Sequence, residues 1–502
     1  MTQPLVIVIV IVAYFLLLLG VSHIVAKGAD NSTFFTGNRH MPWPIVAIAM
    51  ICAPISGVTF ISVPGMVVSK GYSYLQMCLG FIVGYFIISQ VLIPIFYKNR
   101  VISIYSYLEQ RFGKTTYKTG AWLFLASKIL GTAVRFFVIC TVLQLLVFEP
   151  LSLPFPVTVI VTLTLIWLYT VKGGVKTVIW TDLLKCGFLI LSVALCIYFV
   201  VDSMDISLKE FPALLSNHSS VEIFNFNNPN SDTYFWKQFI GGIFLVIAMT
   251  GLDQDMMQHP LSCKDARSSR KNMILSSFLQ CFVISLFLML GTFLMIYAEN
   301  NTISLPDKSD DLFATIAFHE GLPLIVGILF ILGLVSATYS SIGSALTSLT
   351  TSYTLDIAEG GKKYNPEELA KKRKYIHAWI AGVMAVVIII FYYLSHEDAI
   401  SAVYTLASYT YGPILGLFTV GLFTKWQPSS RLIPLVCLLS PLFAWGIKWL
   451  ALNYFDYIIG YELLLINAAF TIGCLRLLSL SGSRKNELSE SENIETEPTQ
   501  FL

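Results

Sequence analysis

Apolar stretches long enough to cross a membrane recur along nearly the whole of this chain. The sequence has 502 residues, of which 56% are hydrophobic and only 12% are charged. A helix crosses the hydrocarbon core with about 20 apolar residues, and inside a membrane it satisfies its own backbone hydrogen bonds. The pattern predicts an all-α polytopic membrane protein with about thirteen transmembrane helices. The expected spans are 4–26, 44–68, 73–97, 119–148, 155–171, 178–200, 235–257, 273–298, 322–355, 375–394, 399–424, 431–453 and 457–480.

Basic residues indicate how these helices are oriented. Lysine and arginine gather in alternate loops, and an excess of this kind is typical of cytoplasmic loops. The sequence therefore predicts a multi-pass protein of the plasma (inner) membrane, with its N-terminus outside and its C-terminus in the cytoplasm. The clusters that carry this prediction are Lys98, Arg100, Arg111, Lys114 and Lys118; Lys264, Arg267, Arg270 and Lys271; and Lys362, Lys363, Lys371, Lys372, Arg373 and Lys374.

One membrane domain accounts for almost the entire chain. We expect residues 1–480 to form it, and residues 481–502, which are polar and acidic, to be a disordered cytoplasmic tail. The net charge of +2 comes mainly from the cytoplasmic loops and argues against a nucleic-acid partner. The expected partners are the lipid bilayer and a small-molecule substrate, and no obligate protein partner is evident.

A stripe of hydroxyl groups lies inside one expected span. Residues 336–354 contain eleven serines and threonines, and several recur at i, i+3, i+4 and i+7, so they share one face of a helix. Such a face can hydrogen-bond a neighbouring helix, or it can replace the water around a hard cation such as Na⁺. The residues on this face are Ala337, Ser340, Ser341, Ser344, Ser348 and Thr351.

Two spans contain residues that interrupt a helix. The second span carries Pro54, Gly57, Pro64 and Gly65, and proline removes a backbone donor. The seventh span ends in a polar segment that begins at Gly251. In transporters built from inverted repeats, interrupted helices in corresponding positions mark the binding site. We therefore expect two five-helix halves, spans 2–6 and 7–11, each opening with a broken helix.

Six motifs identify a family. Taken together and in this order, they resemble the sodium:solute symporter family over residues 1–480, and the pattern is nearest to its sialic-acid, sugar and monocarboxylate branches. The resemblance implies a leucine-transporter-type fold, with two inverted five-helix repeats plus flanking helices. The motifs are FFTGNRHMPW (34–43), SIYSYLEQRFG (103–113), YTVKGGVKTVIWTD (169–182), DQDMMQ (253–258), SATYSSIGSALTSLTTSYTLDI (336–357) and GPILGLFTVGLF (412–423).

The resemblance also implies ion sites. The family's main Na⁺ site maps onto the backbone carbonyls of Cys52, Ile55 and Ala337 and the hydroxyls of Ser340 and Ser341. Five neutral oxygens suit a hard monovalent cation. The alternative is that these hydroxyls bond carbonyls of their own helix or of a neighbouring one.

A second Na⁺ site occurs in some relatives. It maps onto Asp182, Ser340 and Ser344, but Gly343 stands where those relatives have another serine. A carboxylate inside a membrane span is costly and usually functional. The alternative role for Asp182 is to cap the start of the sixth helix.

For the substrate, the resemblance points to Ser56, Thr59, Tyr74 and Cys78 around a central cavity. The sialic-acid branch has a glutamine at the position of Cys78. Arg135 is an intramembrane arginine, and a guanidinium binds carboxylates well. It either recognises an anionic group of the substrate or pairs with an acidic side chain or a helix C-terminus.

The polar cluster Asp253, Gln254 and Asp255 lies at the inner end of the seventh span. We expect it to be either an inner-gate network or a solvated helix end.

The function expected from these features is secondary active transport. Inward Na⁺ flow would drive uptake of a small organic solute by alternating access, with an acidic sugar or another organic anion as first choice. A neutral sugar, an amino acid or a vitamin is the alternative substrate, and a non-transporting solute sensor is the alternative class. No catalytic motif and no site for an organic cofactor is evident, so we expect Na⁺ as coupling ion and no enzyme activity.

Overall fold

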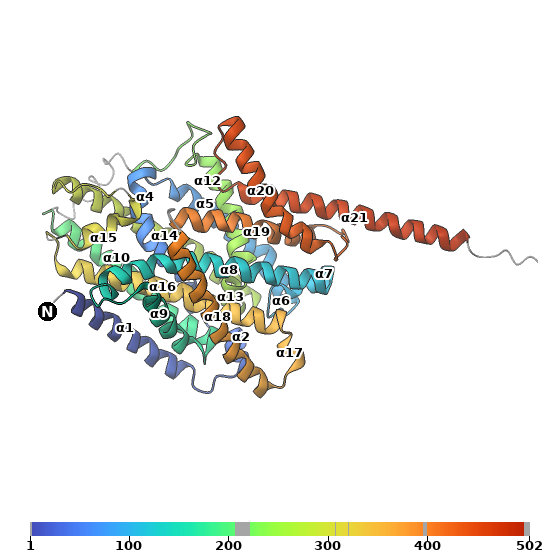
Figure 1. The fold of residues 1–502 in the computed structure, drawn as a ribbon, viewed down its shortest axis with the longest axis horizontal. Helices are drawn as coiled ribbons and strands as arrows, with labels where there is room; N and C mark the ends of the chain where they lie inside the picture. Colours follow the sequence, from blue (N-terminus) through green and yellow to red (C-terminus); the bar gives the residue numbers. More distant parts are fainter. Residues whose placement is uncertain (1–2, 206–220, 307, 320, 395–398, 496–502) are drawn as a thin grey trace, which may run out of the picture.

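The computed structural model describes residues 3–205, 221–306, 308–319, 321–394 and 399–495. Within these ranges no β-strand forms, and the one β contact is an isolated bridge between Met41 and Cys263. Most of the long helices run roughly along one direction of the molecule, and α21 extends from the bundle at the C-terminal end (Figure 1). The predicted all-α fold class is confirmed.

The helices have the following bounds: α1 (Gln3–Val25), α2 (Asn31–Thr36), α3 (Trp43–Cys52), α4 (Gly57–Lys70), α5 (Tyr74–Ile87), α6 (Ile93–Lys98), α7 (Ser106–Phe112), α8 (Lys114–Leu143), α9 (Phe155–Thr170), α10 (Gly174–Asp202), α12 (Phe235–Val246), α13 (Gln254–Leu261), α14 (Ala266–Asn300), α15 (Leu312–Ala317), α16 (Leu324–Ser352), α17 (Gly360–Lys363), α18 (Pro366–Leu394), α19 (Ala399–Phe423), α20 (Ile433–Phe455) and α21 (Leu463–Glu495). Wider π-helical turns continue four of them: η2 (Ile88–Leu92), η3 (Gln144–Phe148), η5 (Ile247–Gly251) and η7 (Tyr353–Ile357).

The number of membrane spans agrees with the sequence pattern. Among the described residues, ten helices are long and apolar enough to cross a membrane, or up to twelve if each of two bent pairs is one span. The apolar helix α9 is shorter, with 16 residues, and it occupies the remaining expected span at 155–171. The chain is a multi-pass membrane protein.

The tail differs from the prediction in one respect. The backbone of α21 stays helical to Glu495, past residue 480, where the sequence predicts the tail to begin. A helix that emerges from the membrane needs no new nucleation, and no proline stands before Pro498. Residues 496–502 of the predicted tail lie outside the described residues.

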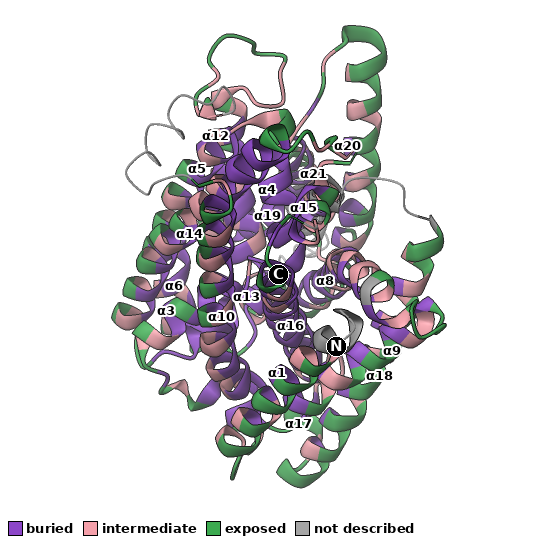
Figure 2. Ribbon diagram, turned by 90° about the vertical axis from the view of Figure 1, so that its left-hand side faces the viewer, coloured by how far each residue is buried: buried purple, intermediate pink, exposed green. Residues whose placement is uncertain are grey.

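Helix α16 forms the centre of the bundle. Its most apolar window is 83% buried, against 22% for α1, α18 and α20. It packs most extensively on α10 and also contacts α8, α4 and α13. Figure 2 shows the buried residues concentrated along α10 and α16, with exposed residues on the outer helices. The hydroxyl stripe therefore lies in the interior of the protein.

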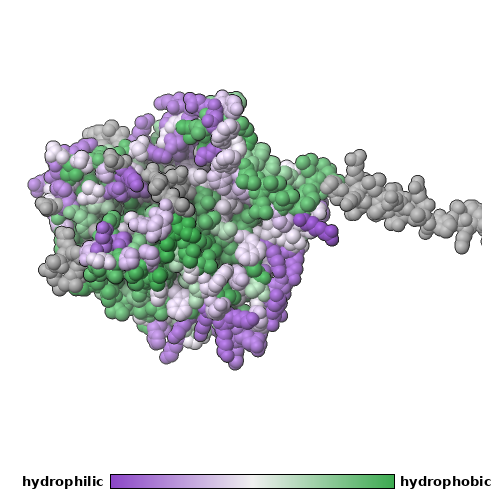
Figure 3. Space-filling model, in the orientation of Figure 1, coloured by the Kyte–Doolittle hydropathy of each residue, from purple (hydrophilic) through white to green (hydrophobic). Residues whose placement is uncertain are grey.

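The surface has the character of a membrane protein. Hydrophobic residues spread across the middle of the face in Figure 3, and hydrophilic residues gather toward its ends. On α20, large apolar side chains such as Leu438 (67% exposed) and Leu442 (64% exposed) point outward. A soluble protein rarely exposes so continuous an apolar surface, and lipid tails would cover it here.

Both predicted helix breaks are present. α3 and α4 are bent by 61° across residues 53–56, and the α12–η5 helix and α13 are bent by 71° at residues 252–253. The helix after each break, α4 or α13, begins with its own N-terminal cap. The Ser56 side chain and Thr59 form a capping box, and the Asp253 carboxylate accepts from the backbone N–H of Asp255 and Met256. These caps satisfy donors that the break exposes.

The first break packs closely against the central helix α16 and against α8. A Cβ added to Gly57 would lie 2.5 Å from Thr338 Oγ1 of α16 and 2.1 Å from Ile139 Cδ1 of α8. A larger residue at this position would require Ile139 or Thr338 to move. The break therefore lies directly beside the N-terminal part of the hydroxyl stripe.

Candidate functional site

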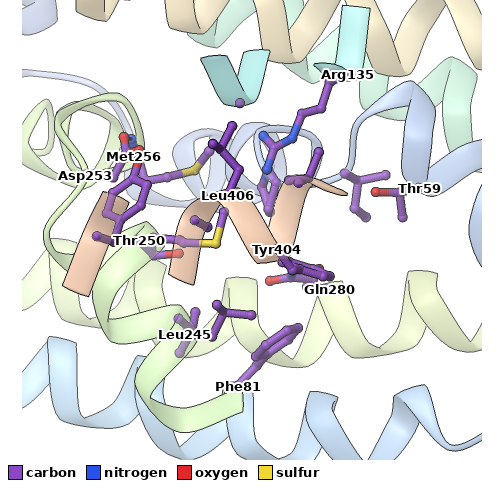
Figure 4. A pocket seen from close by; sticks show the side chains of 18 of the residues that line it. Thr59, Phe81, Arg135, Leu245, Thr250, Asp253, Met256, Gln280, Tyr404 and Leu406 are labelled. Atoms are coloured by element: carbon purple, nitrogen blue, oxygen red, sulfur yellow. Dashed lines mark hydrogen bonds between the residues drawn. The ribbon is translucent and has the colours of Figure 1, made fainter. Parts of the chain in front are cut away.

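A central cavity lies between the two helix breaks. It encloses about 820 Å³ of empty space, including the part that opens to solvent. Both breaks contribute to its wall, together with α5, α8, α14 and α19 (Figure 4). The polar residues that line it are Thr59, Tyr74, Tyr85, Ser127, Lys128, Thr132, Arg135, Thr250, Asp253, Gln280, Tyr404 and Tyr411.

Arg135 points into this cavity from α8 (Figure 4). Its side chain is half-buried, and within the described part of the chain no hydrogen bond or ion pair joins it to another group. The predicted structural role, pairing with an acidic side chain, is thus not seen. A guanidinium free of a protein partner inside a membrane protein is available to an anionic ligand.

The lysine on the same face of α8 behaves differently. Lys128 Nζ lies 3.2 Å from Asp253 Oδ2 and 2.6 Å from Asp255 Oδ2, and all three side chains are buried. Its charge is therefore compensated within the protein. Of the two cations on α8 that face the cavity, Arg135 is the one left for a ligand.

Hydroxyl and amide groups surround the rest of the cavity. The hydroxyls of Tyr74 and Tyr404 are 2.7 Å apart, and the Tyr85 hydroxyl donates to Gln280 Oε1 at 2.9 Å. Thr59 lies on the wall that α4 forms. The cavity thus combines one free cation with several groups that exchange hydrogen bonds with a polar solute.

Two of the predicted substrate residues lie outside the cavity lining. The Ser56 side chain accepts from the backbone of α4 as its cap, because the helix begins there. The backbone carbonyl of Cys78 accepts from the Cys281 thiol at 3.4 Å, so this part of α5 packs on α14. The structure brings Thr59, Tyr74 and Arg135 together and leaves these two apart.

The predicted main Na⁺ site lies where the first break meets α16. Cys52, Ile55 and Ala337 are buried there, as are the two serines. Among the described residues the Ser340 hydroxyl has no hydrogen-bond partner, although burial without a partner is costly. The Ser341 hydroxyl donates to the Thr338 carbonyl at 3.1 Å. An orphaned hydroxyl beside an unwound backbone fits a cation ligand.

Three hydroxyls in the later part of the stripe bond carbonyls of their own helix. The hydroxyls of Thr347, Ser348 and Thr351 donate to carbonyls three or four residues earlier in α16, at 2.9 Å each. This is the alternative role that the sequence left open. Within the stripe, Ser340 is thus a candidate ion ligand, whereas Thr347, Ser348 and Thr351 bond carbonyls of their own helix.

Asp182, a predicted ligand of a second Na⁺, already has a partner. Lys185, one turn later on α10, places its Nζ 3.1 Å from Asp182 Oδ1, and both side chains are completely buried. The alternative capping role of Asp182 is wrong, because α10 begins at Gly174 and Asp182 lies about two turns inside it.

Ser344, the other predicted ligand of that site, also has a partner on another helix. Its hydroxyl donates to Asp255 Oδ1 at 2.5 Å. At Gly343, where some relatives have a serine, a Cβ would lie 2.2 Å from the Tyr169 hydroxyl. Tyr169 therefore fills the space of the absent side chain.

The predicted gate cluster is buried, so it is not a solvated helix end. Asp253 accepts from the Tyr411 hydroxyl of α19 and from Lys128. Gln254 accepts from the backbone N–H of Ile104 at 2.9 Å and donates to the Ile102 carbonyl at 3.1 Å. The second break is thus tied to α8, α19 and the segment before α7.

Sequence reasoning missed several side chains of this region. Lys185 and His259 are buried beside Asp182, and Tyr404, Tyr85 and Gln280 line the cavity. The rule that an ionisable residue within a membrane span is a site candidate would have found Lys185. Tyr404 carries no comparable signal, because aromatic residues are frequent throughout the spans.

The arrangement defines a class of protein. Two interrupted helices that meet around a polar cavity, inside a bundle of membrane-spanning helices, are the architecture of a secondary transporter. The model of one family, the sodium:solute symporter family, matches residues 34–429. The chain belongs to this family. It is a family of transporters, which confirms the prediction that the chain is not an enzyme, and its coupling ion is Na⁺.

Known proteins agree with this assignment. The human sodium/iodide cotransporter is 24% identical over 412 residues, a match that covers 79% of this chain but only 62% of that protein. The sodium/sialic acid symporter NanT of Aliivibrio fischeri is 26% identical over 491 residues, covering 93% of this chain and 92% of that protein. A solved structure of a Na⁺-coupled sialic acid symporter has the same fold, with a TM-score of 0.78 and 20% identity over 93% of this chain and 96% of that one.

Proposed function

We propose that this protein couples inward Na⁺ flow to the uptake of a small organic anion, with an acidic sugar as first choice. The observation that carries the proposal is Arg135, whose guanidinium lies in the central cavity and has no hydrogen-bond or ion-pair partner among the described residues. A carboxylate would satisfy it through charge-assisted hydrogen bonds. The two relatives described above are named for iodide and for sialic acid, which are an anion and an acid that ionises to one.

The remaining wall favours a solute with several hydroxyl groups. Tyr74, Tyr404 and Thr59 each offer a hydroxyl, and Gln280 keeps an amide nitrogen free to donate after accepting from Tyr85. Each polar group of a buried ligand needs a partner, and this wall supplies several. A simple hydrophobic acid would leave most of them unsatisfied.

The proposed Na⁺ site joins the break between α3 and α4 to α16. Carbonyls of Cys52, Ile55 and Ala337 and hydroxyls of Ser340 and Ser341 would hold the ion. Neutral ligands bind Na⁺ without trapping it, since no carboxylate holds the charge. When α16 and the break separate, the site loses ligands and the ion leaves. Binding of Na⁺ would thus favour the conformation in which the two elements are joined.

The cluster around Asp253 and Asp255 would act as the inner gate. In this structure it ties the second break to α8, α16 and α19. The loops rich in basic residues would face the cytoplasm, with the protein in the plasma (inner) membrane and its N-terminus outside. Opening toward the cytoplasm then requires the Lys128 pairs to break.

Ligand binding by the purified protein tests the substrate class. We expect sialic acid or a related sugar acid to raise the thermal unfolding temperature in the presence of Na⁺ but not with K⁺ in its place. The carboxamide analogue of the same sugar should have a much smaller effect. Equal stabilisation by the acid and its amide, or by neutral sugars alone, would contradict an anionic substrate.

A further inference from the structure

Lys185 is enclosed by oxygen atoms at the centre of the protein. Its Nζ lies 3.1 Å from Asp182 Oδ1, 3.0 Å from the Tyr169 hydroxyl and 3.1 Å from the Tyr339 carbonyl oxygen. The ammonium also stands over the Tyr169 ring, 4.6 Å from its centroid. An ammonium has three donors, and all three have partners here. The hydrogen-bonding capacity of this ammonium is therefore fully used by oxygens of the protein.

This group of oxygens coincides with the position expected for a second Na⁺. Asp182 is the carboxylate of that site, and Tyr339 directly precedes Ser340, another of its expected ligands. The Tyr169 hydroxyl occupies the space that a serine at 343 would need, and it donates to the Tyr339 carbonyl at 2.5 Å. Lysine and tyrosine therefore fill the volume that an ion and its serine ligand would occupy.

Ser344, another expected ligand of the second Na⁺, is also bonded elsewhere. Ser344 donates its hydroxyl to Asp255 on α13, so it does not complete a shell around Asp182. The second oxygen of Asp182, Oδ2, has no hydrogen-bond partner and faces His259 Nε2 at 3.6 Å. A Na⁺ ion brought to this oxygen would meet the nearby ammonium, and two like charges repel strongly in a buried site.

From this geometry we infer that the Lys185 ammonium takes the place of a second Na⁺, so that the protein carries one Na⁺ in each transport cycle. The inference rests on the proposed function and deepens it. A cation that is part of the chain neutralises Asp182 in every conformation and is never released. Only the ion at the break between α3 and α4 is then exchanged between the two sides of the membrane.

The number of Na⁺ ions carried in each cycle determines whether the membrane potential helps to drive uptake. One Na⁺ moving with one singly charged anion transfers no net charge. The Na⁺ gradient then drives uptake alone, and the membrane potential contributes nothing. Two Na⁺ ions with the same anion would move one positive charge, and a negative interior would accelerate uptake.

The test measures the fluxes of ²²Na⁺ and of a labelled sugar acid into proteoliposomes that contain the wild-type chain. We expect a ratio of one Na⁺ to one solute, a Hill coefficient near one for Na⁺, and no response to a potential imposed with K⁺ and valinomycin. A ratio of two, or uptake accelerated by an interior-negative potential, would overturn the inference. Absence of any Na⁺-dependent uptake would contradict the proposed function instead, so the two failures are distinguishable.

Variants test the role of Lys185 itself. In Lys185→Gln a Na⁺ ion should replace the ammonium beside Asp182, so the flux ratio rises to about two and uptake responds to the potential. In Asp182→Asn/Lys185→Gln, which lacks both charges, the ratio should return to about one. Lys176→Gln, at a half-buried position about two turns earlier on the same helix, serves as the control and should match the wild type. A ratio of one in a folded Lys185→Gln variant would overturn the inference.

Discussion

Lys128 Nζ lies 2.6 Å from Asp255 Oδ2, and this buried ion pair joins α8 to the second half of the broken seventh span. A second carboxylate, Asp253, lies 3.2 Å from the same nitrogen. Helix α13, which would move when the inner side opens, is therefore held by the charge of Lys128 on α8, the helix that also carries Arg135. The proposed substrate-binding arginine and a partner of the proposed gate thus lie on the same helix.

The first prediction concerns this pair. Lys128→Met should lower the free energy of unfolding by about 3–5 kcal/mol, because it leaves two buried carboxylates without a cation. Thermal or denaturant unfolding of the purified protein measures the loss. Lys118→Met on the same helix is the matched control. Its side chain is 39% exposed and pairs with Glu359 at the surface, so its loss should cost less than about 1 kcal/mol. Equal effects of the two changes would contradict a structural role for the buried pair.

The second prediction concerns substrate charge. Arg135→Gln should raise the KM for a sugar acid about 10–100-fold, since a hydrogen bond to a charged group is worth about 1.5–3 kcal/mol. The KM for the carboxamide analogue should stay nearly unchanged. Initial uptake rates of the two solutes provide the comparison. If the variant weakens both solutes equally, Arg135 acts on the fold of the cavity and not on the anion.

The third prediction concerns the main Na⁺ site. Ser340→Ala should raise the Na⁺ concentration for half-maximal uptake about tenfold, because its unpaired hydroxyl is a proposed ligand. Ser348→Ala is the control on the same helix. That hydroxyl is equally buried but already donates to the Ala345 carbonyl. A Na⁺ dependence that Ser340→Ala leaves unchanged would remove this serine from the site.

The fourth prediction concerns packing at Tyr169. Gly343→Ala should lower the free energy of unfolding by about 1–3 kcal/mol, because the new methyl group would lie 2.2 Å from the Tyr169 hydroxyl. Gly187→Ala on α10 offers the opposite case. No atom lies within 4 Å of its added Cβ, so this variant should gain about 0.5–1 kcal/mol from better helix propensity. Unfolding temperatures that move in the same direction would argue against the close packing described here.

The helix breaks could be predicted from the sequence because their causes are local. Pro54 lacks a backbone donor whatever surrounds it, and the polar segment after Gly251 interrupts an apolar run. The sequence predicts that the hydroxyls share one helix face, but it does not predict the hydrogen-bond partner of each hydroxyl. Which hydroxyls bond their own helix depends on what the neighbouring elements offer. Of the two proposed hydroxyl ligands, Ser341 donates to the Thr338 carbonyl, and Ser340 has no partner among the described residues.

The surroundings of Asp182 depend on contacts far apart in the chain. Lys185 is three residues away, but Tyr169 and Tyr339, which complete its shell, are 16 and 154 positions from it. In the sequence Lys185 is recognisable as an ionisable residue inside the expected sixth span, but these distant partners are not. Ser56 and Cys78 illustrate the converse, because the resemblance to the family assigns them to a cavity whose lining does not include them.

Uptake into proteoliposomes under an inward Na⁺ gradient tests the central claim most directly. Wild-type protein should accumulate a labelled sugar acid above the outside concentration, and accumulation should vanish when K⁺ replaces Na⁺ on both sides or when the Na⁺ gradient is collapsed. Accumulation that persists without a Na⁺ gradient, or no accumulation of any organic anion when neutral solutes are taken up, would contradict Na⁺-coupled anion transport by this protein.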